Sequence, residues 1–112
     1  MQLLVHADSN IALTDQLHER LELKVQSAAN KFPKRITRIQ IYLTDVNSSK
    51  SGINDKRCVI EARPAGLAPI AVNHQASTVE LAIDGASAKL ASVLDSRFGR
   101  LGSDRGASPT DD

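Results

Sequence analysis

The segment 77–94 constrains the fold more than any other part of the chain, because it joins a helix-start signal to a long helical repeat. Ser77 and Glu80 form a capping-box pattern, in which the two side chains satisfy amide groups left open at a helix start. Apolar residues then recur every three or four positions, as on one face of a helix: Val79, Ile83, Ala86, Leu90, Val93 and Leu94. The sequence therefore predicts an amphipathic helix that begins at Ser77.

The segment 14–30 predicts a second helix. Thr14 has the side chain of a helix N-cap. Apolar residues follow at helical spacing: Leu17, Leu21, Val25, Ala28 and Phe32. Pro33 restricts Phe32 to extended conformations, because the proline ring clashes with a helical residue before it. We therefore expect this helix to end near Asn30.

Four other segments alternate polar and apolar residues, which is typical of β-strands with one buried face. They are 2–6, 38–44, 57–63 and 70–74. In the third, Cys58, Ile60 and Ala62 share one side. The polar segment 47–55 predicts a hairpin loop, because Ser, Asn, Asp and Gly favour turns.

The predicted order of elements is strand, helix, three strands, helix. Two amphipathic helices can both cover their apolar faces by packing on the same face of one sheet. The first two strands are expected to be parallel, through a right-handed crossover, and the later hairpins antiparallel. The predicted fold is thus a two-layer α+β sandwich of two helices on a four-stranded mixed sheet. We expect residues 1–101 to form one domain and residues 102–112 a disordered tail.

Composition limits the classes of function. The net charge is +1, but thirteen bases against ten acids give residues 1–101 a charge of +3. The single cysteine, Cys58, excludes an intramolecular disulfide, and no signal-like segment precedes the first strand, which favours a cytoplasmic protein. No apolar run approaches the roughly 20 residues that cross a bilayer, so no membrane partner is expected.

No motif for catalysis, metal binding or nucleotide phosphates occurs. The histidines and the cysteine lie on different predicted elements, without the spacing of metal ligands: His6, His18, His74 and Cys58. Asp84, opposite the apolar stripe, is interpreted as a solvated helix residue rather than a catalytic acid. We therefore expect no enzyme activity, no cofactor, no metal and no small-molecule substrate.

The few aromatic residues bear on RNA recognition. Only Phe32, Tyr42 and Phe98 are aromatic, and both phenylalanines are expected in or near the core, which leaves no platform for stacking bases. Gly85 lies inside a predicted helix, where glycine costs about 1 kcal/mol relative to alanine. It indicates either close approach by another element or a tolerated glycine, and the sequence leaves both open.

Charged residues sort to two flanks on each predicted helix, at about 100° per residue. The basic flanks hold Arg20, Lys24 and Lys31 on the first helix and Lys89 and Arg100 on the second. Simple solvation with weak ion pairs explains this sorting as well as a binding surface does. A cluster of four cations with no acid between them favours binding, because it can neutralise several phosphates. Its members are Lys31, Lys34, Arg35 and Arg38.

Three short motifs occur in the same order as in a known family. They are Met1-Gln2-Leu3, the helix start Leu-Thr-Asp-Gln-Leu at 13–17, and Leu-Ala-Ile-Asp-Gly at 81–85 followed by Lys89-Leu90. Over about residues 1–101 the chain resembles the ribosome hibernation promoting factor and ribosome-associated inhibitor family, also called sigma-54 modulation proteins. It is similar to the short type, which lacks the C-terminal domain by which long members dimerise ribosomes, and the resemblance leads us to expect a monomer.

The resemblance implies a domain similar to double-stranded RNA-binding domains. It also implies binding in the decoding channel of the small ribosomal subunit, where such a protein blocks mRNA and tRNA sites under stress. Basic helix residues would contact ribosomal RNA phosphates. The matching positions are Lys24, Lys31, Lys89, Arg97 and Arg100, and the charge pattern adds Arg20, Lys34, Arg35 and Arg38.

A second hypothesis is a protein-binding regulatory domain with no ribosome binding. It would use an exposed sheet face or edge, where Tyr42, Val59 and Ala71 are expected on the outward side of their strands. A small enzyme is a third hypothesis, which the missing catalytic constellation disfavours.

Overall fold

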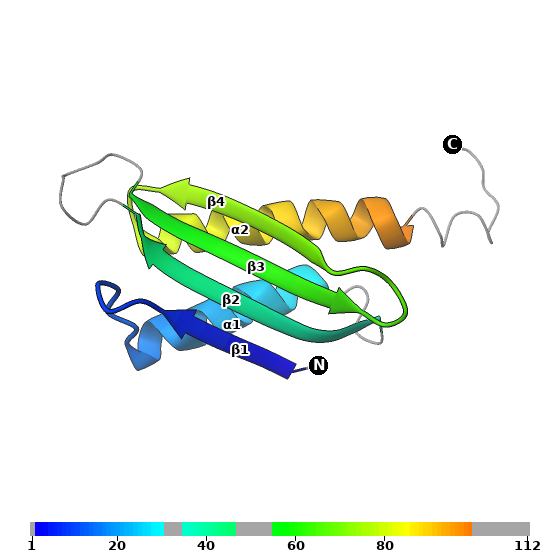
Figure 1. Cartoon of the computed structure of the whole chain (residues 1–112), viewed down its shortest axis with the longest axis horizontal. Coiled ribbons are helices and arrows are strands. Elements are labelled where there is room, and N and C mark those ends of the chain that lie inside the picture. The colour runs from blue at the N-terminus through cyan, green and yellow to red at the C-terminus, as the bar shows by residue number, and fades with distance from the viewer. Residues whose placement is uncertain (1, 31–34, 47–54, 100–112) are drawn as a thin grey trace.

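The computed structural model of the chain describes residues 2–30, 35–46 and 55–99 (Figure 1). The elements follow in the order β1 (Gln2–Ala7), α1 (Asp15–Ala29), β2 (Ile36–Asp45), β3 (Lys56–Pro64), β4 (Ile70–Ala76), α2 (Val79–Leu94) and a short π-helix, η1 (Asp95–Gly99). The predicted order and the α+β class are confirmed. The end expected for α1 is also confirmed, because Asn30 is its C-cap. The predicted tail lies outside the described residues.

The four strands form one sheet in the order β1-β2-β3-β4. β1 is parallel to β2, and the other neighbours are antiparallel, as predicted. Both helices lie on the same side of the sheet, behind the strands in Figure 1. The opposite face of the sheet is open to solvent over the part of the chain that the structure describes.

The core lies between the sheet and the two helices. Alternate residues of the two central strands are buried there: Ile39, Ile41 and Leu43 on β2 and Cys58, Ile60 and Ala62 on β3. The helices contribute the apolar stripes expected from sequence, with Leu21 and Val25 on α1 and Ile83, Leu90 and Leu94 on α2. Fully burying each large side chain contributes about 1.5–3 kcal/mol, so these stripes fix the two layers together.

The helix starts differ in how well the sequence located them. Thr14 caps α1 as predicted, because its Oγ1 accepts a hydrogen bond from the amide of Leu17 at 3.1 Å. The N-cap of α2 is Thr78, whose Oγ1 accepts from the amide of Leu81 at 3.1 Å. The predicted start at Ser77 was wrong by one residue, because β4 runs to Ala76 and the extended residue that caps the helix is Thr78. Glu80 is thereby moved out of the capping-box position.

Gly85 marks a close approach between α2 and β4. A Cβ atom at this position would lie 2.1 Å from Cδ2 of the His74 ring. Such a distance is far inside van der Waals contact, so α2 can lie this close to His74 only with glycine at position 85. The first of the two interpretations of Gly85 is therefore supported.

Candidate nucleic-acid interface

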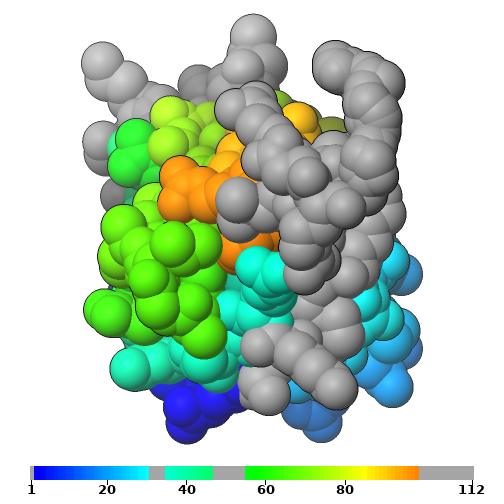
Figure 2. Space-filling view, turned by 90° about the vertical axis from the view of Figure 1, so that its right-hand side faces the viewer, coloured from blue at the N-terminus to red at the C-terminus, as the bar shows by residue number. Residues whose placement is uncertain are grey.

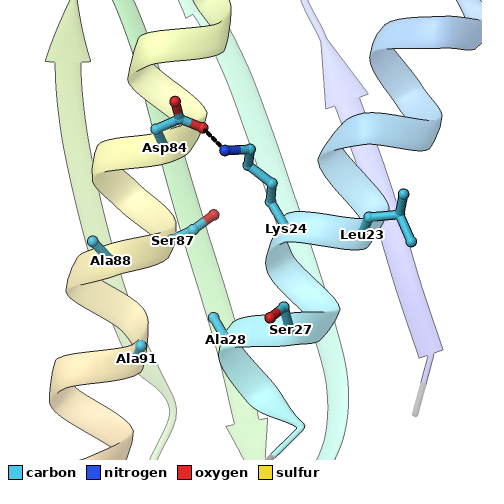
Figure 3. Close-up of a pocket in the computed structure, with 8 residues that line it drawn as sticks. All are labelled: Leu23, Lys24, Ser27, Ala28, Asp84, Ser87, Ala88 and Ala91. Atoms are coloured by element: carbon cyan, nitrogen blue, oxygen red, sulfur yellow. Dashed lines mark ion pairs between the residues drawn. The ribbon is translucent and has the colours of Figure 1, made fainter.

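The basic flank of α1 faces the acidic flank of α2. Arg20 Nη1 lies 2.5 Å from Glu80 Oε2. Lys24 Nζ lies 2.6 Å from Asp84 Oδ1, an ion pair that spans the two helices in Figure 3. All four side chains are about half exposed, so each pair contributes at most about 1 kcal/mol. Two cations expected to bind RNA are thus already held by carboxylates of the same chain.

Lys89 is engaged in another way. It lies on α2, and its Nζ donates a hydrogen bond to the backbone carbonyl of Asn73 at 2.8 Å. Asn73 belongs to β4, which is an edge strand and so leaves some backbone groups without a strand partner. The Lys89 ammonium group is therefore held against the edge of the sheet.

Four arginines gather at one end of the molecule, which we call the arginine end: Arg35, Arg38, Arg63 and Arg97. Arg38 of β2 lies directly opposite Arg63 of β3 in the strand register. The guanidinium carbon of Arg35 lies 5.4 Å from the centre of the Phe98 ring, a cation–π contact that ties the start of β2 to η1. Figure 2 views this end, where the start of β2, the end of β3 and η1 meet. The fold thereby concentrates charge that the sequence spreads over more than sixty residues.

The arginine end is not neutralised by ion pairs in the described part of the chain. None of its four guanidinium groups forms an ion pair with a carboxylate there. Like charges directly opposite each other on neighbouring strands destabilise a sheet, so the Arg38–Arg63 pair costs stability in the free protein. A bound phosphate removes that cost, because each guanidinium group can offer it two parallel hydrogen bonds.

The predicted contact residues divide into three groups. Arg35, Arg38 and Arg97 are brought together by the structure, whereas Arg20, Lys24 and Lys89 lie elsewhere and are engaged within the chain. The third group lies outside the described residues: Lys31, Lys34 and Arg100.

Arg63 is a member of the arginine end that the sequence analysis missed. It closes the third predicted strand, and its backbone carbonyl accepts a hydrogen bond from Thr37 Oγ1 at 3.0 Å. Pairing the strands 38–44 and 57–63 as a hairpin would have placed it beside Arg38, but that signal depends on knowing the register of the two strands.

The two layers differ in charge. The open face of the sheet carries three arginines, Arg38, Arg57 and Arg63, against one acid, Glu61, which gives +2. The described helical residues, 15–29 and 79–99, hold six acids against four bases, or −2. The acids are Asp15, Glu19, Glu22, Glu80, Asp84 and Asp95, and the bases are Arg20, Lys24, Lys89 and Arg97. Within the described residues, the positive excess therefore lies on the sheet.

A shallow groove of about 450 Å³ runs between α1 and α2. Figure 3 shows its small side chains and the Lys24–Asp84 pair that crosses it. The buried Ser87 Oγ has no hydrogen-bond partner among the described residues. Among the described residues, the charged side chains that line the groove are one cation and one anion, so they give the groove no charge excess that would attract a phosphate.

The described residues contain no group of three or more His, Cys, Asp or Glu side chains placed to hold a metal ion. Burial raises the pKa of the Cys58 thiol to about 12, so it stays protonated at neutral pH and is a poor nucleophile. No helix in the described ranges is long and apolar enough to cross a membrane.

Comparisons with known proteins agree with this fold. A family model described as "Sigma 54 modulation protein / S30EA ribosomal protein" matches residues 5–101. The structure is similar to the crystal structure of the Protein Y N-terminal domain from Thermus thermophilus, with a TM-score of 0.70 and 18% sequence identity over 88% of this chain and 99% of that chain. It is also similar to a ribosomal subunit interface protein from Coxiella burnetii, with a TM-score of 0.68 and 16% identity over the same shares. No curated protein gives a significant match to the sequence.

Proposed function

Because the chain belongs to the sigma 54 modulation protein / S30EA ribosomal protein family, we propose that it is a ribosome hibernation factor that silences translation under stress. It binds in the decoding channel of the small ribosomal subunit and blocks the sites of mRNA and tRNA. The mechanism is steric and electrostatic, with no covalent step. Off the ribosome the protein is a monomer. A structurally similar protein from Coxiella burnetii is described as a ribosomal subunit interface protein, which supports an association with the ribosome.

The observation that carries the proposal is the Arg38–Arg63 pair. Arg38 and Arg63 lie directly opposite each other in the register of β2 and β3, and neither forms an ion pair with a carboxylate within the described residues. This arrangement becomes favourable when a phosphate lies between them. We therefore assign the primary contact with ribosomal RNA to the arginine end. Lys31 and Lys34, which precede Arg35, and Arg100, which follows η1, extend it along the sequence.

The cations on the helices act as secondary contacts. Arg20 and Lys24 reach a phosphate only by leaving Glu80 and Asp84, and Lys89 only by leaving the edge of β4. Because the two ion pairs are half exposed, breaking each costs at most about 1 kcal/mol. Ribosomal RNA can therefore compete for these side chains once the arginine end is bound.

Co-sedimentation with purified small subunits across a salt series tests the proposal. Each phosphate contact adds roughly 0.7–0.9 to the slope of log affinity against log salt, so wild-type binding is expected to fall steeply. The double variant Arg38→Gln/Arg63→Gln is expected to bind more weakly and to lower the slope by about 2. A control with the same change in net charge is Gln16→Glu/Gln26→Glu, at two exposed positions of α1, and it should retain the wild-type slope.

Two results would count against the proposal. Absent or salt-insensitive association of the wild-type protein would refute binding to ribosomal RNA and favour a protein-binding regulatory domain. Equal losses of affinity in Arg38→Gln/Arg63→Gln and in the control Gln16→Glu/Gln26→Glu would show that binding depends on net charge and not on the arginine end.

A further inference from the structure

The open face of the sheet carries a pair of stacked rings on its edge strand β1 and the neighbouring strand β2. His6 of β1 lies directly opposite Tyr42 of β2 in the parallel register. The two ring centres are 4.9 Å apart, and the ring planes differ by 16°. His6 is exposed and Tyr42 is half-buried, so the imidazole is the outer member of the stack. The sheet thus presents a flat ring to solvent that is supported from behind by a second ring.

A hydrogen-bonded side chain holds both rings in place. Gln40 Oε1 lies 3.2 Å from His6 Nε2 and accepts a hydrogen bond from the Tyr42 hydroxyl at 3.1 Å. An amide oxygen only accepts, so His6 Nε2 carries the proton in this contact. Gln40 Nε2 in turn donates to Glu61 Oε1 at 3.5 Å, which fixes the orientation of the amide. The stacked pair is therefore positioned before any ligand arrives.

Arginines lie on both sides of the stacked pair. Arg57 lies opposite Thr44 near one end of the strands, and Arg63 lies opposite Arg38 near the other. Arg57 and Arg63 are separated along β3 by about 20 Å, at about 3.4 Å per residue. Val59, which lies opposite Tyr42, and Glu61, which lies opposite Gln40, fall between them on the same face. A positive group, flat rings and a second positive group thus follow one another along the open face.

This pattern fits a single-stranded nucleic acid better than a duplex or an acidic peptide. Unpaired bases expose flat faces that stack on aromatic side chains, and the phosphates between them need cations. A duplex hides its base faces within the helix, and the carboxylates of an acidic peptide do not stack on the exposed imidazole. The net charge of +2 on this face suits a polyanion.

We propose that the open face of the sheet binds a single-stranded RNA segment. One base stacks on the outer face of His6, and flanking phosphates contact Arg57 on one side and Arg38 with Arg63 on the other. The inference rests on the proposed function, since it shares two arginines with the arginine end, but it adds a contact with a base that phosphate binding alone does not need.

Tyr42 provides a direct test, because the chain has one tyrosine and no tryptophan and its intrinsic fluorescence therefore reports on this residue. Titration with oligoadenylate is expected to quench that fluorescence to saturation. An adenine–uracil duplex at matched absorbance should cause only the loss due to light absorbed by the bases, without saturation. Affinity is measured separately from the anisotropy of labelled oligoadenylate.

Variants of two histidines complete the test. His6→Ala should weaken oligoadenylate binding roughly tenfold, as expected for the loss of one stacked base. The matched control, His18→Ala, removes a histidine from α1 on the other side of the molecule and should leave binding unchanged. His6→Phe keeps a flat ring and should retain most of the binding, which separates stacking from a general effect on folding.

The failure of this inference is distinguishable from failure of the proposed function. Salt-dependent co-sedimentation with the small subunit, together with a flat Tyr42 titration, would overturn the sheet-face assignment and leave the ribosome proposal standing. Wild-type affinity in His6→Ala would also overturn it. Saturable quenching that His6→Ala weakens and His6→Phe restores would support it, whatever the ribosome experiment gives.

Discussion

The ammonium group of Lys24 lies 2.6 Å from a carboxylate oxygen of Asp84 and so joins the middle of α1 to the first half of α2. Together with the Arg20–Glu80 pair, it shows that the basic flank of one helix and the acidic flank of the other are complementary. The sorting of charges seen in the sequence therefore has a structural cause, and cations on a helix flank are not by themselves evidence of a free binding surface.

Removing the carboxylate that holds Lys24 should release this cation for RNA. Asp84→Asn is expected to raise the affinity for small subunits at low salt and to lower the free energy of unfolding by at most about 1 kcal/mol, because the pair is half exposed. Co-sedimentation and urea unfolding measure the two effects. Glu19→Gln, which removes one negative charge from an exposed position of α1, is the control. An equal gain in affinity from Glu19→Gln would attribute the effect to net charge.

The N-cap of α2 can be located by two alanine variants. Thr78→Ala should destabilise the protein by about 1 kcal/mol, because the amide of Leu81 loses its hydrogen-bond acceptor. Ser77→Ala should have a clearly smaller effect, since Ser77 precedes the cap. Urea unfolding of the two variants measures the difference. A larger loss for Ser77→Ala would restore the capping box that the sequence indicated.

Gly85 should not tolerate a side chain while His74 is present. Alanine has the higher helix propensity, by about 1 kcal/mol, yet Gly85→Ala should destabilise the protein by about 1–3 kcal/mol, because the new Cβ overlaps the His74 ring. In the double variant His74→Ala/Gly85→Ala the second substitution should no longer be destabilising. A double-mutant cycle by urea unfolding gives the coupling between the two positions. Additive effects would show that the close approach does not limit position 85.

The buried thiol of Cys58 should lower the free energy of unfolding in alkaline solution. Burial raises its pKa from the ordinary value of 9.0 to about 12 in the folded protein. Between these values the unfolded chain releases the thiol proton while the folded chain keeps it, so the free energy of unfolding falls as the pH rises from about 9 to about 12. Because other groups also ionise in alkaline solution, the comparison is with Cys58→Ala. The variant should lose less stability over the same interval, and parallel curves would contradict the assignment.

Much of the fold could be predicted because the signals for it are local. The spacing of Leu21 and Val25, or of Ile83, Leu90 and Leu94, identifies a helix face without knowledge of its partner. The alternation around Ile39 and Ile41 likewise identifies a strand and its buried side. Even so, local signals did not choose between Ser77 and Thr78 as the cap of α2, since that choice depends on where β4 leaves the sheet.

The candidate sites needed the tertiary structure. The packing of α1 beside α2 pairs Lys24 with Asp84, so this cation is held within the chain. The register of β2 and β3 places Arg38 opposite Arg63, where neither forms an ion pair within the described residues. The parallel pairing of β1 with β2 likewise brought His6 onto Tyr42. The sequence by itself determined the elements and their buried faces, because hydrophobic periodicity follows from the backbone repeat of a single segment. Only the tertiary structure decided which polar side chains meet, because residues distant along the chain become neighbours only through strand register and helix packing.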